Sequence, residues 1–434
     1  MREMKESGIE WIGQTPESWG NTKIKYQISK RYGGCWGEDE TNENDYLCIR
    51  IADFDFSRQC IKTTASTYRH YTKKQLCAML KDGDIIIEKS GGGEKTPVGR
   101  TVLYNEKELP KAMFANFCDC IRPNYDINNK FLVLYLKALY QNIDMHLFFN
   151  QTTGLQNLNM QRYLNNKISI PSFQEQQLIA DFLDKKCNEI DFLTSDIQKQ
   201  IETLQQYKKS IITEAVTKGL DPNVEMKDSG VEWIGVIPKH WNIDKIKYHL
   251  KRNEPKNPGN AEVLSVYRDY GVIPKNSRDD NHNVTSDDTS KYKYVKKGDL
   301  VINKMKAWQG SMGVSEYEGI VSPAYFIFNF TDNYFNKKYF HFLIRNCYKD
   351  EFRRISGGIR EGQWDLPSDL FANELVLIPP IEEQIEIVDY LDGKCSEIDS
   401  LIEEKNKQLE TLEQYKKSLI YEYVTGKKEV PNYV

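Results

Sequence analysis

Two stretches of the chain carry apolar side chains at a seven-residue step. In residues 174–216 the step falls on five positions: Leu183, Ile190, Ile197, Leu204 and Ile211. Residues 391–419 carry a similar stripe, on Leu391, Cys395, Ile398, Ile402, Leu409, Leu412 and Leu419. A stripe of this period is typical of a long helix that packs lengthwise against another helix. Because neither stretch contains proline, the pattern predicts two long helices.

The chain also repeats itself. Residues 7–26, which begin Ser-Gly-Ile-Glu-Trp-Ile-Gly, return as residues 229–248, which begin Ser-Gly-Val-Glu-Trp-Ile-Gly. The Ile-Pro, Glu-Gln and Tyr-Lys-Lys-Ser elements of residues 170–210 return at 378–418. The long stretches between these blocks do not repeat. A duplicated frame with divergent inserts predicts one scaffold that presents two different surfaces.

The order of the repeats predicts how the long helices run. The first leads from insert one to insert two, and the second leaves insert two as the chain ends. Each helix needs a partner along its stripe, so we expect the two to pack on each other. Because they run in opposite directions between the inserts, the packed helices would be antiparallel. Matching Pro-Asn pairs, at 222–223 and 431–432, predict that the C-terminus returns to the start of the chain.

Both inserts read as mixtures of strands and short helices. Short β-branched or aromatic runs predict strands, at residues 84–87, 101–104, 299–302 and 325–328. Residues 130–136 and 338–344 predict short helices at matching places. The expected fold class is therefore α+β, with two mixed α/β domains joined by two long antiparallel helices in a pseudo-two-fold, circular arrangement. The expected divisions are 1–171 (domain 1), 172–217 (helix 1), 218–379 (domain 2) and 380–434 (helix 2 and C-terminal return).

Charge is divided unevenly along the chain. The net charge of −4 hides two basic inserts: residues 22–165 carry 20 basic and 16 acidic side chains, and residues 244–373 carry 21 and 17. The rest of the chain carries 18 basic and 30 acidic side chains. The inserts are therefore the expected contacts for nucleic acid, although ordinary charge variation between domains is an alternative. No membrane span or signal peptide is expected, and a cytoplasmic location is the default.

One polar loop in each insert could contact DNA. Residues 90–96 are rich in glycine but lack the Gly-Lys-Thr of a nucleotide-binding loop. The residues expected to meet DNA here are Lys89, Ser90, Lys95 and Arg100. A plain hairpin tip is the alternative. In the second insert the equivalent set is Lys304, Lys306, Trp308 and Gln309, unless this is a surface loop with a buried tryptophan.

A second polar cluster follows late in each insert. Amide and guanidinium groups match the edges of bases in the major groove. The first insert offers Gln151, Gln156, Asn157 and Asn159, and the second offers Arg360, Gln363 and Trp364. Glycine-containing turns that cap a helix are the alternative interpretation.

The sequence offers no candidate catalytic or metal site. The motifs of adenine methyltransferases, common nucleases, zinc proteases and serine hydrolases are missing. Nine cysteines without a Cys-x-x-Cys pair do not predict structural zinc. We therefore expect a chain that is not catalytic alone and holds no metal.

This arrangement resembles the specificity subunit of type I restriction-modification systems. The resemblance rests on residues 8–13 with Pro16 and Trp19, on Gly83-Asp84, Ser90-Gly91 and Val98-Gly99-Arg100, and on Pro171 with Glu175-Gln176, with copies of the first and last sets. Insert two departs from this pattern, because Met305-Lys306 stands where insert one has Ser90-Gly91. The resemblance covers essentially the whole chain.

The resemblance implies a role for each part. Each insert would be a target-recognition domain that reads one half of a split, asymmetric sequence in double-stranded DNA. The helices would set the gap and bind two methyltransferase subunits, and motor/nuclease subunits would join the full complex. S-adenosylmethionine, ATP and Mg would be held by those partners, with no cofactor on this chain. Two alternatives are a coiled-coil adaptor without DNA readout and a self-contained DNA-modifying enzyme.

Overall fold

The chain forms two compact units that share its two long helices. A computed structural model describes residues 2–431 except 42–43, 153, 260, 269, 278–287 and 359–363. Unit 1 comprises Met1–Ile197 and Lys407–Val434, and unit 2 comprises Gln198–Asn406. The unit boundaries fall inside the helices, so the units differ from the four segments expected from the sequence.

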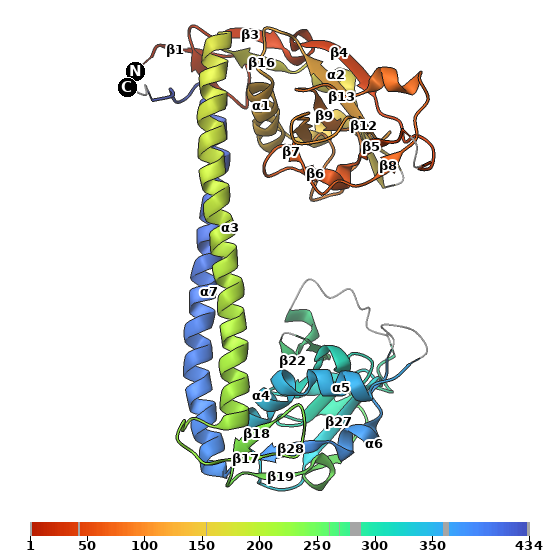
Figure 1. The fold of residues 1–434 in the computed structure, drawn as a ribbon, viewed down its shortest axis with the longest axis vertical. Coiled ribbons are helices and arrows are strands. Elements are labelled where there is room, and N and C mark those ends of the chain that lie inside the picture. Colours follow the sequence, from red (N-terminus) through yellow and green to blue (C-terminus); the bar gives the residue numbers. More distant parts are fainter. Residues whose placement is uncertain are drawn as a thin grey trace. The chain divides into compact units, whose positions relative to one another are not determined.

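Both predicted long helices are confirmed (Figure 1). Helix α3 spans Phe173–Lys218 and helix α7 spans Ile381–Val424. In the described part of the chain, no helix is long and apolar enough to cross a membrane.

Within unit 1, α3 and α7 pack side by side in opposite directions. The rings of Phe182 and Tyr423 lie 4.6 Å apart between their centroids. Further along α3, Asp191 Oδ1 accepts a hydrogen bond from Lys416 Nζ at 2.6 Å. Residue numbers rise on α3 while they fall on α7, so the two segments are antiparallel.

Unit 2 contains the same pairing. Lys208 Nζ on α3 lies 2.6 Å from Asp399 Oδ1 on α7. Near the end of α3, Ile211 and Ala215 line a cavity together with Tyr390 of α7. The direction is again antiparallel, as the apolar stripes predict.

Domain 1 in unit 1 has three layers. The central sheet has six strands in the order β4 (Ile28–Gly33), β13 (Cys118–Pro123), β9 (Ile85–Glu88), β11 (Thr101–Leu103), β7 (Cys60–Ile61) and β6 (Phe54–Asp55). Successive strand residues face opposite sides of a sheet. Ile85 and Ile87 therefore join the core under helix α1 (Asn129–Asn142), whereas Ile86 joins the core on the other face. That second face is covered by a sheet of β12 (Ala112–Phe114), β5 (Tyr46–Ile49) and β8 (Tyr68–Arg69).

Domain 2 in unit 2 repeats this layering on a smaller sheet. Its strands are β20 (Leu250–Arg252), β27 (Tyr325–Phe330), β24 (Leu300–Asn303) and β25 (Met312–Val314). Leu300 and Ile302 pack under helix α4 (Lys337–Cys347), and Val301 faces the other core. Two two-stranded sheets contribute to that core: β21 (Leu264–Tyr267) with β22 (Gly271–Pro274), and β23 (Lys293–Val295) with β26 (Gly319–Val321). The predicted strands and short helices of both inserts are confirmed.

The repeated tryptophans attach each domain to the start of a long helix. Trp19 is 1 % exposed, and its Nε1 donates to Glu175 Oε1 at 3.2 Å. Trp241 is fully buried and donates in the same way to Glu383 Oε2 at 2.9 Å. Each tryptophan follows a short hairpin, β1 (Met4–Glu6) with β2 (Gln14–Pro16), and β17 (Met226–Asp228) with β18 (Val236–Pro238). The duplicated motif is therefore a structural joint.

The glutamine after each of these glutamates forms a second joint. Gln176 is 2 % exposed, and its Oε1 accepts from Asn128 N at 2.8 Å, just before α1. Gln384 accepts from Asn336 N at the same distance, just before α4. A buried amide is costly without partners, so each glutamine fixes the approach of a domain helix to its long helix.

The C-terminal segment lies against the start of the chain in unit 1. Lys427 Nζ donates to Ile12 O at 2.7 Å, and Arg2 Nε lies 3.7 Å from Glu429 Oε1. The glycine that follows each long helix adjoins the tryptophan of a repeated motif, Gly426 beside Trp19 and Gly219 beside Trp241.

These two glycines give a matched pair of substitutions. Both have positive φ, +77° at Gly426 and +76° at Gly219, so alanine is strained by about 1–2 kcal/mol at either position. At Gly426 a Cβ would also come within 2.4 Å of Pro16, whereas at Gly219 its nearest neighbour would be 3.4 Å away. In denaturant unfolding, Gly426→Ala should lower the free energy of unfolding by about 1–3 kcal/mol more than Gly219→Ala. Equal losses would contradict the close packing of the C-terminal segment.

Candidate nucleic-acid interface

In domain 1 the two predicted polar clusters form one small sheet. Strand β10 (Ser90–Gly91) pairs with β15 (Leu155–Leu158), which pairs with β14 (Phe149–Thr152). Leu158 N donates to Lys89 O at 2.8 Å, which fastens the far end of β15 to the first cluster. The segments around residues 90 and 157 are thus parts of a single surface.

Gln156 lies on the inner side of this sheet. The residue is 2 % exposed, and its Oε1 accepts from Val98 N at 3.1 Å. Its Nε2 donates to Gly93 O at 3.3 Å, so both ends of the amide hold the glycine-rich loop. This placement corrects the expectation that Gln156 offers its amide to a base. Asn159 is also engaged, because its Oδ1 caps helix α2 (Met160–Leu164) through Arg162 N at 3.0 Å.

Two of the three predicted cations of this loop have acidic partners. Lys89 Nζ lies 3.0 Å from Asp119 Oδ1, and Arg100 Nε lies 2.7 Å from Glu88 Oε2. Both carboxylates are buried, and a buried carboxylate requires a positive partner. Arg100 therefore neutralises Glu88, whereas Lys89 shares Asp119 with Arg31, whose Nη2 lies 2.7 Å from Asp119 Oδ2. Lys95 is exposed and has no ion-pair partner among the described residues.

The exposed side of the same sheet carries a polar row that includes a residue not predicted from the sequence. Ser90, Asn157 and Asn150 lie opposite one another on the three strands. Ser90 Oγ donates to Asn157 Oδ1 at 2.7 Å, which leaves the two amide hydrogens of Asn157 to face outward. Asn150 is exposed beside it. A hairpin register that pairs Thr152 with Leu155 would have placed Asn150 opposite Asn157 on one face.

Domain 2 also brings its two predicted segments together. Lys304 O accepts from Leu366 N at 3.0 Å, and Lys304 Nζ lies 3.2 Å from Asp365 Oδ2. The rings of Trp308 and Trp364 lie 5.4 Å apart at an angle of 51°. The loop after β24 and the segment before Leu366 are therefore in contact through these two tryptophans.

The remaining predicted residues of domain 2 differ in accessibility. Lys306 is exposed and has no ion-pair partner among the described residues, whereas Gln309 is half-buried. Trp308 is also half-buried, and its Nε1 donates to Met305 O at 3.2 Å. Arg360 and Gln363 lie outside the described residues, as does the side chain of Gln151.

The strands that carry these loops begin with the same turn. In domain 1, Asp84 Oδ2 accepts from Lys81 N at 2.8 Å, and in domain 2, Asp299 Oδ2 accepts from Lys296 N at 2.8 Å. Both aspartates are buried. The segments Lys-Asp-Gly-Asp at 81–84 and Lys-Lys-Gly-Asp at 296–299 therefore form equivalent turns.

The two turns differ in their electrostatics. Arg122 pairs with Asp84 at 2.7 Å, and this carboxylate raises the pKa of the guanidinium. Asp299 has the amide of Asn329 as its side-chain partner instead, and burial raises the pKa of Asp299. The frame of the turn is therefore duplicated, while its charge balance is specific to each domain.

Comparison with known proteins places this geometry in a family. Residues 35–203 match the model of the type I restriction modification DNA specificity domain. A chain of Methanocaldococcus jannaschii, designated the MjaX specificity subunit of a type I restriction enzyme, is 25 % identical over 96 % of this chain and 95 % of its own length. The EcoKI specificity subunit of Escherichia coli K12 is 20 % identical over 79 % of this chain and 74 % of its own.

Together these matches indicate a type I restriction-modification specificity subunit. A solved structure concerned with complex assembly and conformational transition of the type I R-M system contains a similar fold, with a TM-score of 0.66 and 13 % identity. The alignment covers 95 % of this chain and 99 % of that one. The specificity fold therefore extends over both domains and both long helices.

Two adjacent amides of this specificity subunit should respond differently to truncation. Gln156→Ala removes the acceptor for the buried Val98 N–H, so the free energy of unfolding should fall by about 1–3 kcal/mol. Asn157→Ala, on the exposed face of the same strand, should change it by less than about 0.5 kcal/mol. Denaturant unfolding of both variants measures the difference. A Gln156→Ala protein as stable as the parent would show that the amide does not support the loop.

Proposed function

We propose that this chain is the DNA-recognition subunit of a type I restriction-modification complex and reads a split, asymmetric target through its two domains. The observation that carries this proposal is the pair of loop surfaces. Each follows an equivalent strand, β9 or β24, in an equivalent layered domain, yet the side chains differ. One surface presents serine and asparagine, and the other presents lysine and tryptophan. Equivalent positions with different chemistry suit two half-sites of different sequence.

The duplicated frame supports a circular, pseudo-two-fold arrangement. The Trp–Glu and Asn–Gln joints occur once in each unit, as does the antiparallel helix pairing. In unit 1 the C-terminal segment reaches the motif that, in unit 2, follows α3 directly in the chain. A closed frame of this kind would present the two domains as related copies.

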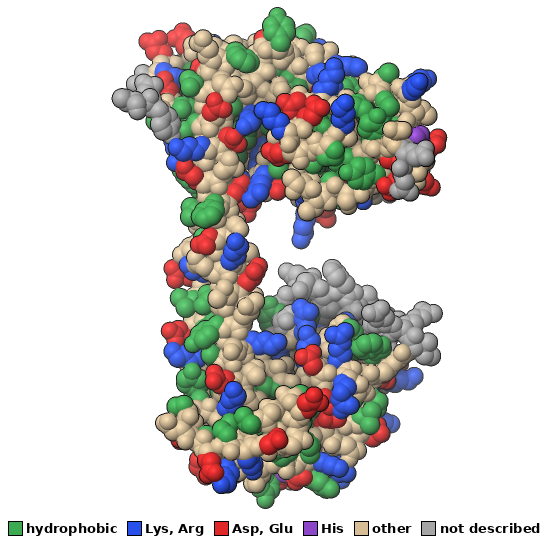
Figure 2. Space-filling model, in the orientation of Figure 1, with side chains coloured by type: hydrophobic (Ala, Val, Ile, Leu, Met, Phe, Trp, Pro, Cys, Tyr) green, Lys and Arg blue, Asp and Glu red, His purple; other side chains and the backbone are tan. Residues whose placement is uncertain are grey.

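The long helices offer equivalent surfaces for two copies of one partner. In unit 1, Leu193 is 49 % exposed and Tyr415 is 53 % exposed; in unit 2, the matching Leu401 and Tyr207 are 41 % and 53 % exposed. Hydrophobic side chains along the helices are visible in Figure 2. Exposed apolar groups beside an ion pair are typical of protein interfaces. The partners proposed are two methyltransferase subunits, which would hold S-adenosylmethionine, with motor/nuclease subunits that would hold ATP and Mg.

An adaptor without DNA readout is the competing function. It would use the same helix surfaces but would leave the exposed polar row of domain 1 and the exposed Lys95 and Lys306 without a role. A DNA-binding assay at low salt separates the two functions, because only the recognition subunit binds duplex DNA with an affinity that falls as salt rises.

The proposed roles of Asn157 and Lys95 predict different binding defects. The target is first identified by mapping methylated adenines in a host with and without this chain and its partners. Asn157→Ala should then weaken binding roughly 5- to 100-fold for the correct half-site of domain 1 and leave base preference at the other half unchanged. Lys95→Ala should weaken binding to all sequences alike and make it less dependent on salt. Loss of discrimination at both half-sites of the Asn157→Ala protein would refute the assignment.

The proposed docking surfaces predict a change in stoichiometry. Leu193→Glu places a charge at one surface, Leu401→Glu at the other, and burial of an unpaired charge opposes association. Native mass spectrometry of the complex should give two methyltransferase subunits for the parent, one for each single variant and none for the double variant. Lys199, which lies on α3 and is exposed, provides a control, since the Lys199→Glu protein should still bind two methyltransferase subunits. Two bound subunits in the double variant would exclude these surfaces.

A further inference from the structure

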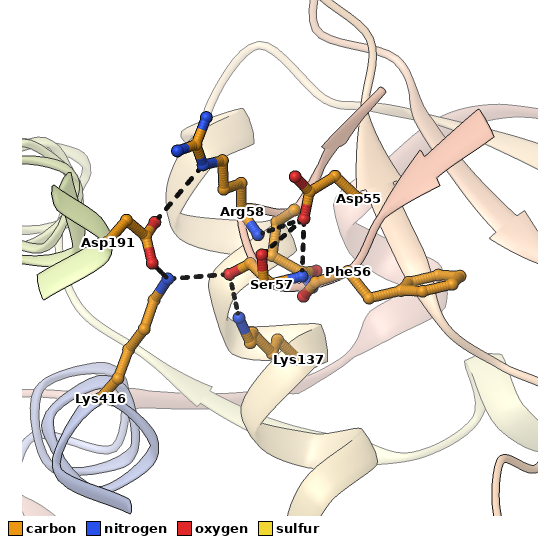
Figure 3. A network of polar contacts seen from close by, with 8 residues as sticks. Asp55, Phe56, Ser57, Arg58, Lys137, Asp191 and Lys416 are labelled. Atoms are coloured by element: carbon orange, nitrogen blue, oxygen red, sulfur yellow. Dashed lines mark hydrogen bonds and ion pairs between the residues drawn. The ribbon is translucent and has the colours of Figure 1, made fainter. Parts of the chain in front are cut away.

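One loop of domain 1 contacts both long helices at a single point. The loop lies between β6 and β7, and the carbonyl oxygen of Ser57 points toward the helices (Figure 3). Lys416 Nζ of α7 donates to this oxygen at 2.9 Å, and Lys137 Nζ of α1 donates to it at 2.8 Å. Lys416 Nζ also donates to Asp191 Oδ1 of α3 at 2.6 Å. One ammonium group thus joins α7, α3 and the domain.

Hydrogen bonds within the loop itself hold its conformation. Asp55 Oδ1 accepts from Ser57 N at 3.0 Å, from Ser57 Oγ at 2.6 Å and from Arg58 N at 3.1 Å. These hydrogen bonds lower the pKa of the Asp55 carboxyl group, although its burial acts in the opposite direction. The next residue, Gln59, has a positive φ of 58°, a conformation that costs an ordinary side chain free energy. The direction of the Ser57 carbonyl is therefore fixed by the loop itself.

The contact is sensitive to the loss of any member. The side chain of Lys416 is 11 % exposed, and that of Asp191 is 15 % exposed. Burial lowers the pKa of Lys137 to about 8, and repulsion by Lys416 adds to this effect. Two ammonium groups at one carbonyl are tolerated because Asp191 supplies the opposite charge. Arg58 Nε lies 3.8 Å from the second oxygen of Asp191. Removal of one partner from such a cluster leaves an uncompensated charge.

The duplicated frame contains a natural comparison for this cluster. Lys208 and Asp399 in unit 2 are the repeat counterparts of Lys416 and Asp191, and they form the same ion pair at 2.6 Å. The side chain of Lys208 is 28 % exposed, and its described hydrogen bonds go to the two oxygens of Asp399 alone. The ion pair therefore belongs to the frame, whereas the link to a variable loop is described in unit 1.

We infer that Lys416 is a positioning residue that fixes the orientation of domain 1 on the helix pair and so restricts the gap between the half-sites that the chain accepts in double-stranded DNA. This inference rests on the proposed function. Recognition of the bases belongs to the loops of each domain and is independent of Lys416. Without the link, domain 1 remains attached through its apolar core and the Trp19 joint but can tilt on the helices. The half-sites then stay the same while the permitted gap broadens.

The test compares Lys416→Met with its repeat counterpart, Lys208→Met, in the full chain with its partner subunits. Adenine methylation is mapped across the genome of a host that carries each protein. The parent and Lys208→Met should methylate one pair of half-sites at one gap length. Lys416→Met should methylate the same half-sites also at gaps one base pair longer or shorter, with methylation at those sites raised roughly tenfold. Lys416→Arg, which keeps the donor and the charge, should restore the single gap.

A second pair of variants keeps the test decisive if Lys416→Met does not fold. Asp191→Asn is nearly isosteric and removes the charge that holds Lys416, so it should broaden the gap, whereas Asp399→Asn should not. A single gap length in folded Lys416→Met or Asp191→Asn protein would overturn the inference. Broadening by Lys208→Met to the same extent would also overturn it, because the ion pair rather than the Ser57 link would then be responsible. If the parent yields no methylated motif, the proposed function itself fails.

Discussion

The structure depends on the burial of one apolar stripe on each long helix. An isolated helix of this kind would leave its apolar stripe in water. Within each unit the stripes meet antiparallel and merge with the core of the adjacent domain. Ile190 of α3 and Leu419 of α7 join the core of domain 1, and Leu391 joins that of domain 2. Helix pairing and domain packing are consequently parts of a single apolar core in each unit.

The polar joints determine how each domain meets that core. A buried Trp19 or Trp241 needs an acceptor for its indole N–H, and a buried Gln176 or Gln384 needs partners for its amide. The tryptophans donate to Glu175 and Glu383 at the start of each long helix. The glutamines, which lie on the same first turns, accept from the backbone just before α1 and α4. Apolar packing alone would tolerate small rotations, whereas these directional bonds favour one orientation. This explains why the repeated residues cluster at the joints and the variable residues lie away from them.

The basic character of the inserts is only partly available to DNA. In domain 1 three buried carboxylates, at Asp84, Glu88 and Asp119, each pair with at least one lysine or arginine on or next to the same sheet. The number of basic side chains in an insert therefore overstates the number free to meet phosphates. What remains exposed is a small set of amides and lysines on loops supported by this interior network. Affinity and base readout in the proposed function depend on that smaller set.

The sequence alone determined the two long helices, the duplicated frame and the short strands of both inserts, because periodicity and repetition are properties of local residue order. It also located the polar segments near residues 90, 157, 304 and 364. Only the tertiary structure decided which side chains those segments expose. The pairing of β15 with β10 turned Gln156 inward and brought Asn150 beside Asn157, and buried carboxylates claimed Lys89 and Arg100. These outcomes depend on strand register and on partners far apart in the chain, which residue type and spacing do not specify.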